Sequence, residues 1–306
     1  TLYLWMRRFL QTVELRSGGR TTSIGGPNVV RAVGWTDADA LLPWPTFSQS
    51  GYRYLQEYFT LPAKFLFLDV VDLHKAGELT EDRVELRFTF ERPPALEARI
   101  SPDNFRLHCT PVINLFETSA DPVKLDPLVY EHLLRASGMN PKHMEIYEVT
   151  EVIGVRQGQT QRRNYKPFFG FAHGSPAKAR EQDLAYFTLR PTPSPIDDGV
   201  DMYLSVVTPR DVAPSEVEET LSLDVRCTNR SLPAELQLGE ISTTPRGTSS
   251  AAAFKNITAV TTPVRPPLGS ELHWRLLSHL AINRQSLGDA DTLKALLGLY
   301  NFQKDT

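Results

Sequence analysis

The chain has 306 residues, of which 41% are hydrophobic and 23% charged, so it can bury one large hydrophobic core or two ordinary ones. Its formal net charge of −3, with both signs mixed, excludes the broad basic surface that nucleic acid or an anionic membrane attracts. No run of about 18 apolar residues occurs, so no segment is predicted to insert into a membrane. No secretory signal is visible, and the chain opens at Thr1 inside an apolar pattern, so we expect a fragment of a longer protein.

The first third of the chain is predicted to mix helices and strands. Six apolar residues recur at helical spacing over residues 2–13, which places them on one helix face: Leu2, Trp5, Met6, Phe9, Leu10 and Val13. After two glycine pairs, a short helix is predicted over residues 50–59, with an apolar side made of Tyr52, Leu55 and Phe59. The run KFLFLDVV at 64–71 predicts a buried strand, and the alternation over 84–90 predicts a strand with one wet face.

The remainder is predicted to be mainly β until its last helices. Short runs rich in β-branched and aromatic residues favour a sandwich or open barrel, and they cover residues 146–155, 184–190, 200–207 and 220–227. Stiff, proline-rich surface loops are predicted at 191–199 and 208–216, and a mobile loop at 243–254. Two apolar stripes, at 272–280 and 293–300, predict a helical hairpin at the end.

The predicted fold class is therefore α+β and mainly β, with antiparallel sandwich or barrel-like domains, flanking helices and a C-terminal helical hairpin. We expect an α+β domain over residues 1–125 and a mainly β domain over residues 126–306. No internal repeat of 20–50 residues is apparent, which argues against a solenoid or a propeller.

The two cysteines are too few for a disulfide scaffold, and they lack zinc-site spacing, which is typical of a reducing compartment. Cys227 ends the alternation Leu221, Leu223, Val225, so it is predicted to point inward as a small core residue. Cys109 stands beside His108, whose side chain points elsewhere on a strand, so we do not predict a catalytic pair. These observations favour the cytoplasm.

The sequence contains none of the P-loop, dinucleotide-binding, nucleophile-elbow, HExxH or EF-hand motifs. The best acidic cluster is Asp197, Asp198 and Asp201, a set that suits a hard cation or the paired carboxylates of a glycosidase. The neighbouring Pro195 and Gly199 favour a solvated turn instead. We therefore predict no catalytic residue, no cofactor, no metal site and no enzymatic activity.

Aromatic and basic residues alternate in RRNYKPFFGF at 162–171, a pattern that also occurs where proteins stack on single-stranded nucleic acid. The acidic balance argues against that interpretation. Pro167 makes the segment extended, so Phe168 and Phe169 are predicted either to pack in the core or to contact a partner.

Five motifs in this order resemble one family, the type VI secretion baseplate subunit TssF, also called VasA or ImpG. The motifs are ALLPWPTFSQSGYRYLQEYFTLPAKFLFLD at 40–69, FRLHCTPVINLFETSADPVKLD at 105–126, YKPFF at 165–169, RPPLGSELHWRLLSHLAIN at 265–283 and ADTLKALLGLYNF at 290–302. Since family members extend well beyond the N-terminal end of these motifs, the resemblance implies the C-terminal half of a longer subunit.

The resemblance implies a structural part of a baseplate wedge in the bacterial cytoplasm, within a membrane-docked apparatus. Its implied partners are TssG, TssK and the sheath-linked TssE, around the VgrG spike, with more than one copy of this subunit in each wedge. Our candidates for partner contact are Pro167, Phe168, Phe169, Trp274 and Arg275. Two alternatives stay open, a secreted carbohydrate-binding β-sandwich and a hydrolase that uses the aspartate cluster.

Overall fold

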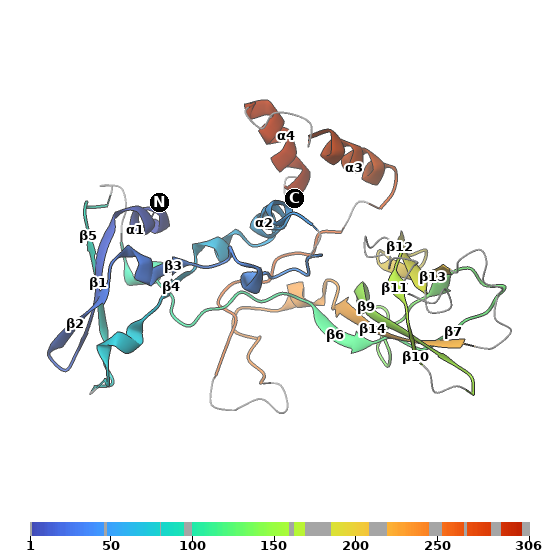
Figure 1. Cartoon of the computed structure of the whole chain (residues 1–306), viewed down its shortest axis with the longest axis horizontal. Coiled ribbons are helices and arrows are strands. Elements are labelled where there is room, and N and C mark those ends of the chain that lie inside the picture. Colours follow the sequence, from blue (N-terminus) through green and yellow to red (C-terminus); the bar gives the residue numbers. More distant parts are fainter. Residues whose placement is uncertain are drawn as a thin grey trace, which may run out of the picture. The chain divides into compact units, whose positions relative to one another are not determined.

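The computed structural model describes most of the chain, namely residues 2–45, 48–79, 81–94, 100–158, 162–168, 185–207, 219–244, 253–265, 268–282 and 289–301. Its described part is mainly β with four α-helices, and all but one of its strand pairings are antiparallel, as predicted (Figure 1). Packing divides the chain into unit 1, residues 1–113 with 284–306, and unit 2, residues 114–283. The domain boundary expected near residue 126 stays a prediction.

Unit 1 is built on a small antiparallel sheet with the strand order β2-β1-β5, and on the two-stranded pair β3-β4. Its helices and strands are α1 Leu2–Phe9, β1 Leu10–Ser17, β2 Arg20–Gly25, β3 Val30–Ala32, α2 Ser50–Thr60, β4 Leu68–Val70, β5 Glu85–Phe90 and α4 Ala290–Tyr300. Apolar residues of β1, β2 and β3 form its core, among them Val13, Leu15, Ile24 and Val30.

The helix predicted over residues 2–13 is wrong in its second half, because α1 ends at Phe9 and β1 begins at Leu10. Leu10 and Val13 are both buried although an odd spacing separates them, which a regular strand does not allow. A register shift between Leu10 and Thr12, opposite β5, returns both side chains to the core face. The bulge therefore produces a spacing that imitates a helix, and pairing on both sides of β1 makes the strand the more stable choice.

The strand predicted over 64–71 is also largely wrong. Residues Pro62–Leu66 form a 3-10 helix, and only Leu68–Val70 are a strand. The predicted helix over 50–59 is confirmed as α2, yet the residues that it buries most are Arg53 and Glu57. The 3-10 turn that replaces the predicted strand brings Lys64 to α2. There the buried Lys64 pairs with Glu57, which explains why Glu57 is buried.

The predicted strand over 84–90 is confirmed by β5, in which Glu85, Arg87 and Thr89 are exposed and the alternate residues are half-buried. At the other end of the chain, α4 packs against α2, where the rings of Tyr52 and Tyr300 stack with centroids 6.4 Å apart. Burial, and secondarily Tyr52, raises the pKa of Tyr300 to about 12.

Unit 2 contains two sheets that share one apolar core. Its elements are β6 Phe116–Ser119, β7 Val123–Lys124, β8 His132–Leu133, β9 Glu145–Arg156, β10 Arg162–Asn164, β11 Lys166–Pro167, β12 Tyr186–Pro193, β13 Val200–Val207, β14 Glu219–Thr228 and α3 Ser270–Ile282. One sheet has the order β10-β9-β14-β6 with β7 on β14, and the other has the order β11-β12-β13-β8. Buried residues of β9 and β14 meet those of β12 and β13, as in a sandwich.

The four strands predicted in this half are confirmed by β9, β12, β13 and β14. The alternation along β14 buries Leu221, Leu223, Val225 and Cys227, as predicted, and burial raises the pKa of the Cys227 thiol to about 11. Cys109 is partly exposed, and its sulfur donates to the Leu107 carbonyl at 3.5 Å.

The loop predicted at 191–199 begins later than expected, because β12 pairs with β13 through Pro193. Prolines are tolerated where a strand has no neighbour on its other side, and β11 pairs only with the start of β12. The predicted loop at 208–216 and most of the one at 243–254 lie outside the described residues. The two predicted C-terminal helices are present as α3 and α4.

Candidate partner-contact surfaces

Two of the five candidate contact residues lie at the β11 edge of the second sheet in unit 2. Pro167 is exposed in β11, and residue Phe168 is 48% exposed. The Phe168 amide donates to the Phe187 carbonyl at 2.8 Å, and its ring lies edge-on to Tyr186 with centroids 6.1 Å apart. The backbone of Phe168 is therefore held by the sheet, although the residue stays about half exposed. Phe169 lies outside the described residues.

The other two candidates lie on α3, which exposes large apolar side chains. Trp274 is 72% exposed and Arg275 is partly buried. Leu272, Leu276 and Leu277 are also exposed. α3 and the β11 edge are thus two candidate surfaces, both in unit 2.

The four large apolar side chains of α3 that are exposed make it a candidate contact helix. By helical spacing Leu272, Leu276 and Leu277 belong to the predicted apolar stripe and Trp274 lies outside it, and all four are exposed. Exposed tryptophan and arginine are the residues most enriched at the energetic centres of protein interfaces. The cluster Leu272, Trp274, Leu276 and Leu277 is therefore a stronger candidate for partner contact than a scattered exposed leucine.

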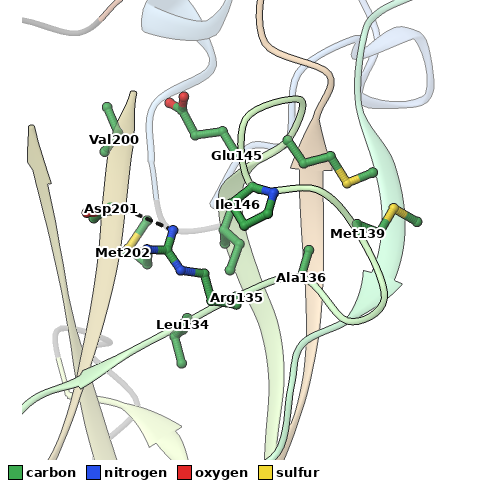
Figure 2. Close-up of a pocket in the computed structure, with 11 residues that line it drawn as sticks. Leu134, Arg135, Ala136, Met139, Glu145, Ile146, Val200, Asp201 and Met202 are labelled. Atoms are coloured by element: carbon green, nitrogen blue, oxygen red, sulfur yellow. Dashed lines mark hydrogen bonds and ion pairs between the residues drawn. The ribbon is translucent and has the colours of Figure 1, made fainter. Parts of the chain in front are cut away.

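A small pocket in unit 2 lies beside the predicted aspartate cluster, and Figure 2 shows Arg135 reaching Asp201 across it. The Arg135 guanidinium lies 3.1 Å from the Asp201 carboxylate, which is buried. The pocket encloses about 20 Å³, which is room for about one water molecule. A sugar ring does not fit there, so this pocket does not support the hydrolase hypothesis.

The other two aspartates of the cluster bind Arg230, which the sequence did not point to. The Arg230 guanidinium lies 3.0 Å from Asp197 and 3.2 Å from Asp198, and it also contacts Glu145 at 3.6 Å. It donates to the carbonyls of Pro141 and Lys142 as well. The expected solvated turn is wrong for Asp201, which is buried in β13, while Asp197 and Asp198 lie in an exposed bend and are also paired with Arg230.

This arrangement makes the stability of unit 2 depend on pH. The hydrogen bond from Arg230, followed by that from the Gly199 amide, lowers the pKa of Asp197 below its ordinary value. The carboxylate thus contributes stability above the unfolded pKa of about 3.9, and that contribution is lost as the pH falls through the lower folded value. Asp197→Asn is expected to lower the urea midpoint at pH 6 and to change it much less at pH 3. An equal difference at both pH values would contradict this assignment.

A second charged cluster, which the sequence also did not point to, lies inside unit 1. Glu57 accepts hydrogen bonds from the Leu41 and Leu42 amides at 2.7 and 3.2 Å and forms a buried ion pair with Lys64. One turn earlier on α2, buried Arg53 contacts Asp37 at 2.7 Å. The only signal in the sequence is that Arg53 and Glu57 are one helical turn apart, a spacing shared by many exposed pairs. This cluster holds α2 to its loop and is structural.

The described residues contain no group of three or more His, Cys, Asp or Glu side chains placed to hold a metal ion. No helix in the described part of the chain is long and apolar enough to cross a membrane.

Comparison with known proteins decides the family. The family described as "Type VI secretion system, TssF" matches residues 1–306. The chain belongs to the TssF family. The resemblance inferred from the five motifs is therefore confirmed over the whole length of the chain.

Relatives of known function agree with this assignment. The chain is 31% identical to type VI secretion system component TssF1 of Pseudomonas aeruginosa, over 90% of this chain and 47% of that protein. It matches a chain in the TssK-TssF-TssG baseplate subcomplex with a TM-score of 0.77 and 29% identity, covering 100% of this chain and 56% of that one. A chain of the type VI baseplate complex matches with a TM-score of 0.51 and 28% identity, over 84% and 44% of the two chains. The TssF-family chain thus spans about half the length of these relatives.

Proposed function

We propose that this TssF-family chain is part of a structural subunit of the type VI secretion baseplate wedge. The observation that carries the proposal is the match, over 100% of the chain, to a subunit-length chain solved within a TssK-TssF-TssG subcomplex. Two packed β-rich units are suited to transmit force, because a close-packed core with a hydrogen-bonded sheet resists deformation.

The proposed partners are TssG and TssK, which occur with TssF in the solved subcomplex. The proposal extends to TssE and to a VgrG-type spike, with more than one copy of this subunit in each wedge. Contacts of this kind are made by a few buried aromatic or arginine anchors inside a larger interface, which makes assembly specific. The subunit is proposed to work in the bacterial cytoplasm, within an apparatus docked to the membrane, without insertion into the bilayer or binding of nucleic acid.

The proposed role is to hold and transmit, without catalysis, cofactor or metal. The acidic residues that gave the sequence its best catalytic candidates are engaged by Arg135 and Arg230. Carboxylates paired with arginine in this way are poor candidates for a general acid, since a nearby arginine stabilises the ionised form. The α3 cluster and the β11 edge are the surfaces that we propose for partner contact, through Trp274, Arg275, Pro167, Phe168 and Phe169.

Co-expression tests the proposal. The whole natural subunit that contains this chain should co-elute with TssG and TssK of the same bacterium in size-exclusion chromatography. Residues 1–306 alone, run in parallel, report whether this part is sufficient for the complex. If the whole subunit elutes alone while both partners are folded, the wedge proposal fails. Glycan binding and hydrolase assays then test the two alternatives.

A further inference from the structure

One four-residue sequence occurs twice in unit 1, and the two copies pair with each other. Val-Glu-Leu-Arg stands at residues 13–16 in β1, and again at residues 84–87, where it enters and forms the first half of β5. The two strands are antiparallel neighbours in the sheet (Figure 1), and the register of their pairing sets Leu15 opposite Leu86. The fold thus shows that this sequence is complementary to a second copy of itself.

The register explains the complementarity. Glu14 lies opposite Arg87 and Arg16 lies opposite Glu85, so opposite charges face each other on the exposed side of the sheet. On the other side, Val13 lies opposite Phe88. On each side of the sheet, charged residues therefore lie opposite charged residues and apolar residues opposite apolar ones. Such matching specifies the register of an antiparallel pair.

The other edge of β5 is open among the described strands, because the sheet has the order β2-β1-β5. Its core-facing side chains Leu86, Phe88 and Phe90 are only half-buried, whereas Val13 and Leu15 in the central strand are buried. No ion pair between described residues uses Glu85 or Arg87. Residues 84–90 also lack the proline and lysine that protect many edge strands from pairing with another chain.

We propose that the open edge of β5 is a self-association surface, which pairs antiparallel with β5 of a second copy of this chain about a two-fold axis at Leu86. In this register Glu85 faces Arg87 of the second copy, Arg87 faces its Glu85, and Val84 faces its Phe88. These are the pairings that β1 already makes with β5, with the second copy taking the place of β1. Two three-stranded sheets then join into one continuous sheet, and the half-buried side chains of β5 gain an apolar neighbour.

Charge selects this register over its neighbours. A two-fold axis at Arg87 would place that arginine opposite itself, and an axis at Phe88 would place Glu85 opposite Glu91. A two-fold axis between Arg87 and Phe88 would place these two residues opposite each other, so that a side chain of the exposed side would face one of the apolar side. The axis at Leu86 makes two symmetric ion pairs between residues of β5 itself, whereas axes at Val84 or Thr89 would need Arg83 or Glu91, which lie outside the strand. This surface does not depend on the wedge partners proposed above, so it is tested separately from them.

The test uses charge reversal in the whole natural subunit, with analytical ultracentrifugation as the readout. Glu85→Arg leaves two arginines at the edge and Arg87→Glu leaves two glutamates, so each variant alone is expected to self-associate about 10-fold more weakly than the wild type. An equimolar mixture of the two variants restores both ion pairs across the axis. We expect the mixture to associate as heterodimers with an affinity close to that of the wild type.

The double variant Glu85→Arg with Arg87→Glu separates this surface from a simple loss of fold. It restores the charges across the two-fold axis but sets like charges opposite Glu14 and Arg16 within its own sheet. We therefore expect self-association to be recovered while thermal stability falls slightly. The proposal is overturned if the wild type stays monomeric, if flanking sequence or another subunit covers β5, or if the mixture associates no better than each variant alone.

Discussion

Glu57→Leu is expected to lower the free energy of unfolding of unit 1 by about 3–5 kcal/mol, because it leaves the Lys64 ammonium buried without its partner. The side chains of Glu57 and Lys64 are 0% and 2% exposed. The same substitution also removes the acceptor of the Leu41 and Leu42 amides. Urea unfolding followed by tryptophan fluorescence measures the loss, since Trp35 lies against Phe65 with ring centroids 4.9 Å apart.

Two further variants show whether charge burial is the cause. Glu57→Leu combined with Lys64→Met is expected to be more stable than Glu57→Leu alone, because no unpaired charge remains in the core. Glu81→Gln, at an exposed position of the same unit, is the matched control and is expected to change the free energy of unfolding by less than about 0.5 kcal/mol. If Glu57→Leu were as mild as this control, the buried pair would not hold α2 in place.

Trp274→Ala is expected to weaken binding to the TssG and TssK partners by about 30-fold or more while leaving the subunit folded. Trp274 is 72% exposed, so its removal creates no cavity in the free chain. At the centre of an interface the same truncation typically costs about 2 kcal/mol or more. Biolayer interferometry with immobilised partner complex measures the loss, and circular dichroism checks the fold.

The control for Trp274 is Ile196→Ala, a residue of unit 2 that is 79% exposed and lies in a loop instead of on α3. We expect this variant to bind like the wild type. Arg275→Ala extends the test along the helix and is expected to weaken binding less than Trp274→Ala. If Trp274→Ala and Ile196→Ala bound equally well, α3 would not be a contact surface for these partners.

Sequence reasoning was most successful where one short pattern decides the structure. The alternation in β5 and β14 predicted both the strand and the side that each residue faces, because side chains of a strand alternate with a period of two. The order of five motifs along the chain was sufficient to predict the family. Neither inference needs to know which strands are neighbours.

The same reasoning failed where a distant partner changes a local preference. The bulge in β1 depends on pairing with β5, about 70 residues later, and without that strand the spacing of Leu10 and Val13 favours a helix. The burial of Glu57 depends in the same way on a 3-10 turn that delivers Lys64. Local periodicity carries no information about either partner.

The sequence by itself thus determined the family, the mainly β class, the places of most strands and the inward side of Cys227, since these follow from local spacing. Only the tertiary structure decided that Asp197 and Asp201 are held by Arg230 and Arg135, because each pair joins residues that are far apart in the chain. It also decided that β5 is an open edge, since strand order is a property of the folded sheet. Ion pairs and sheet edges arise from long-range pairing, which no local window of sequence contains.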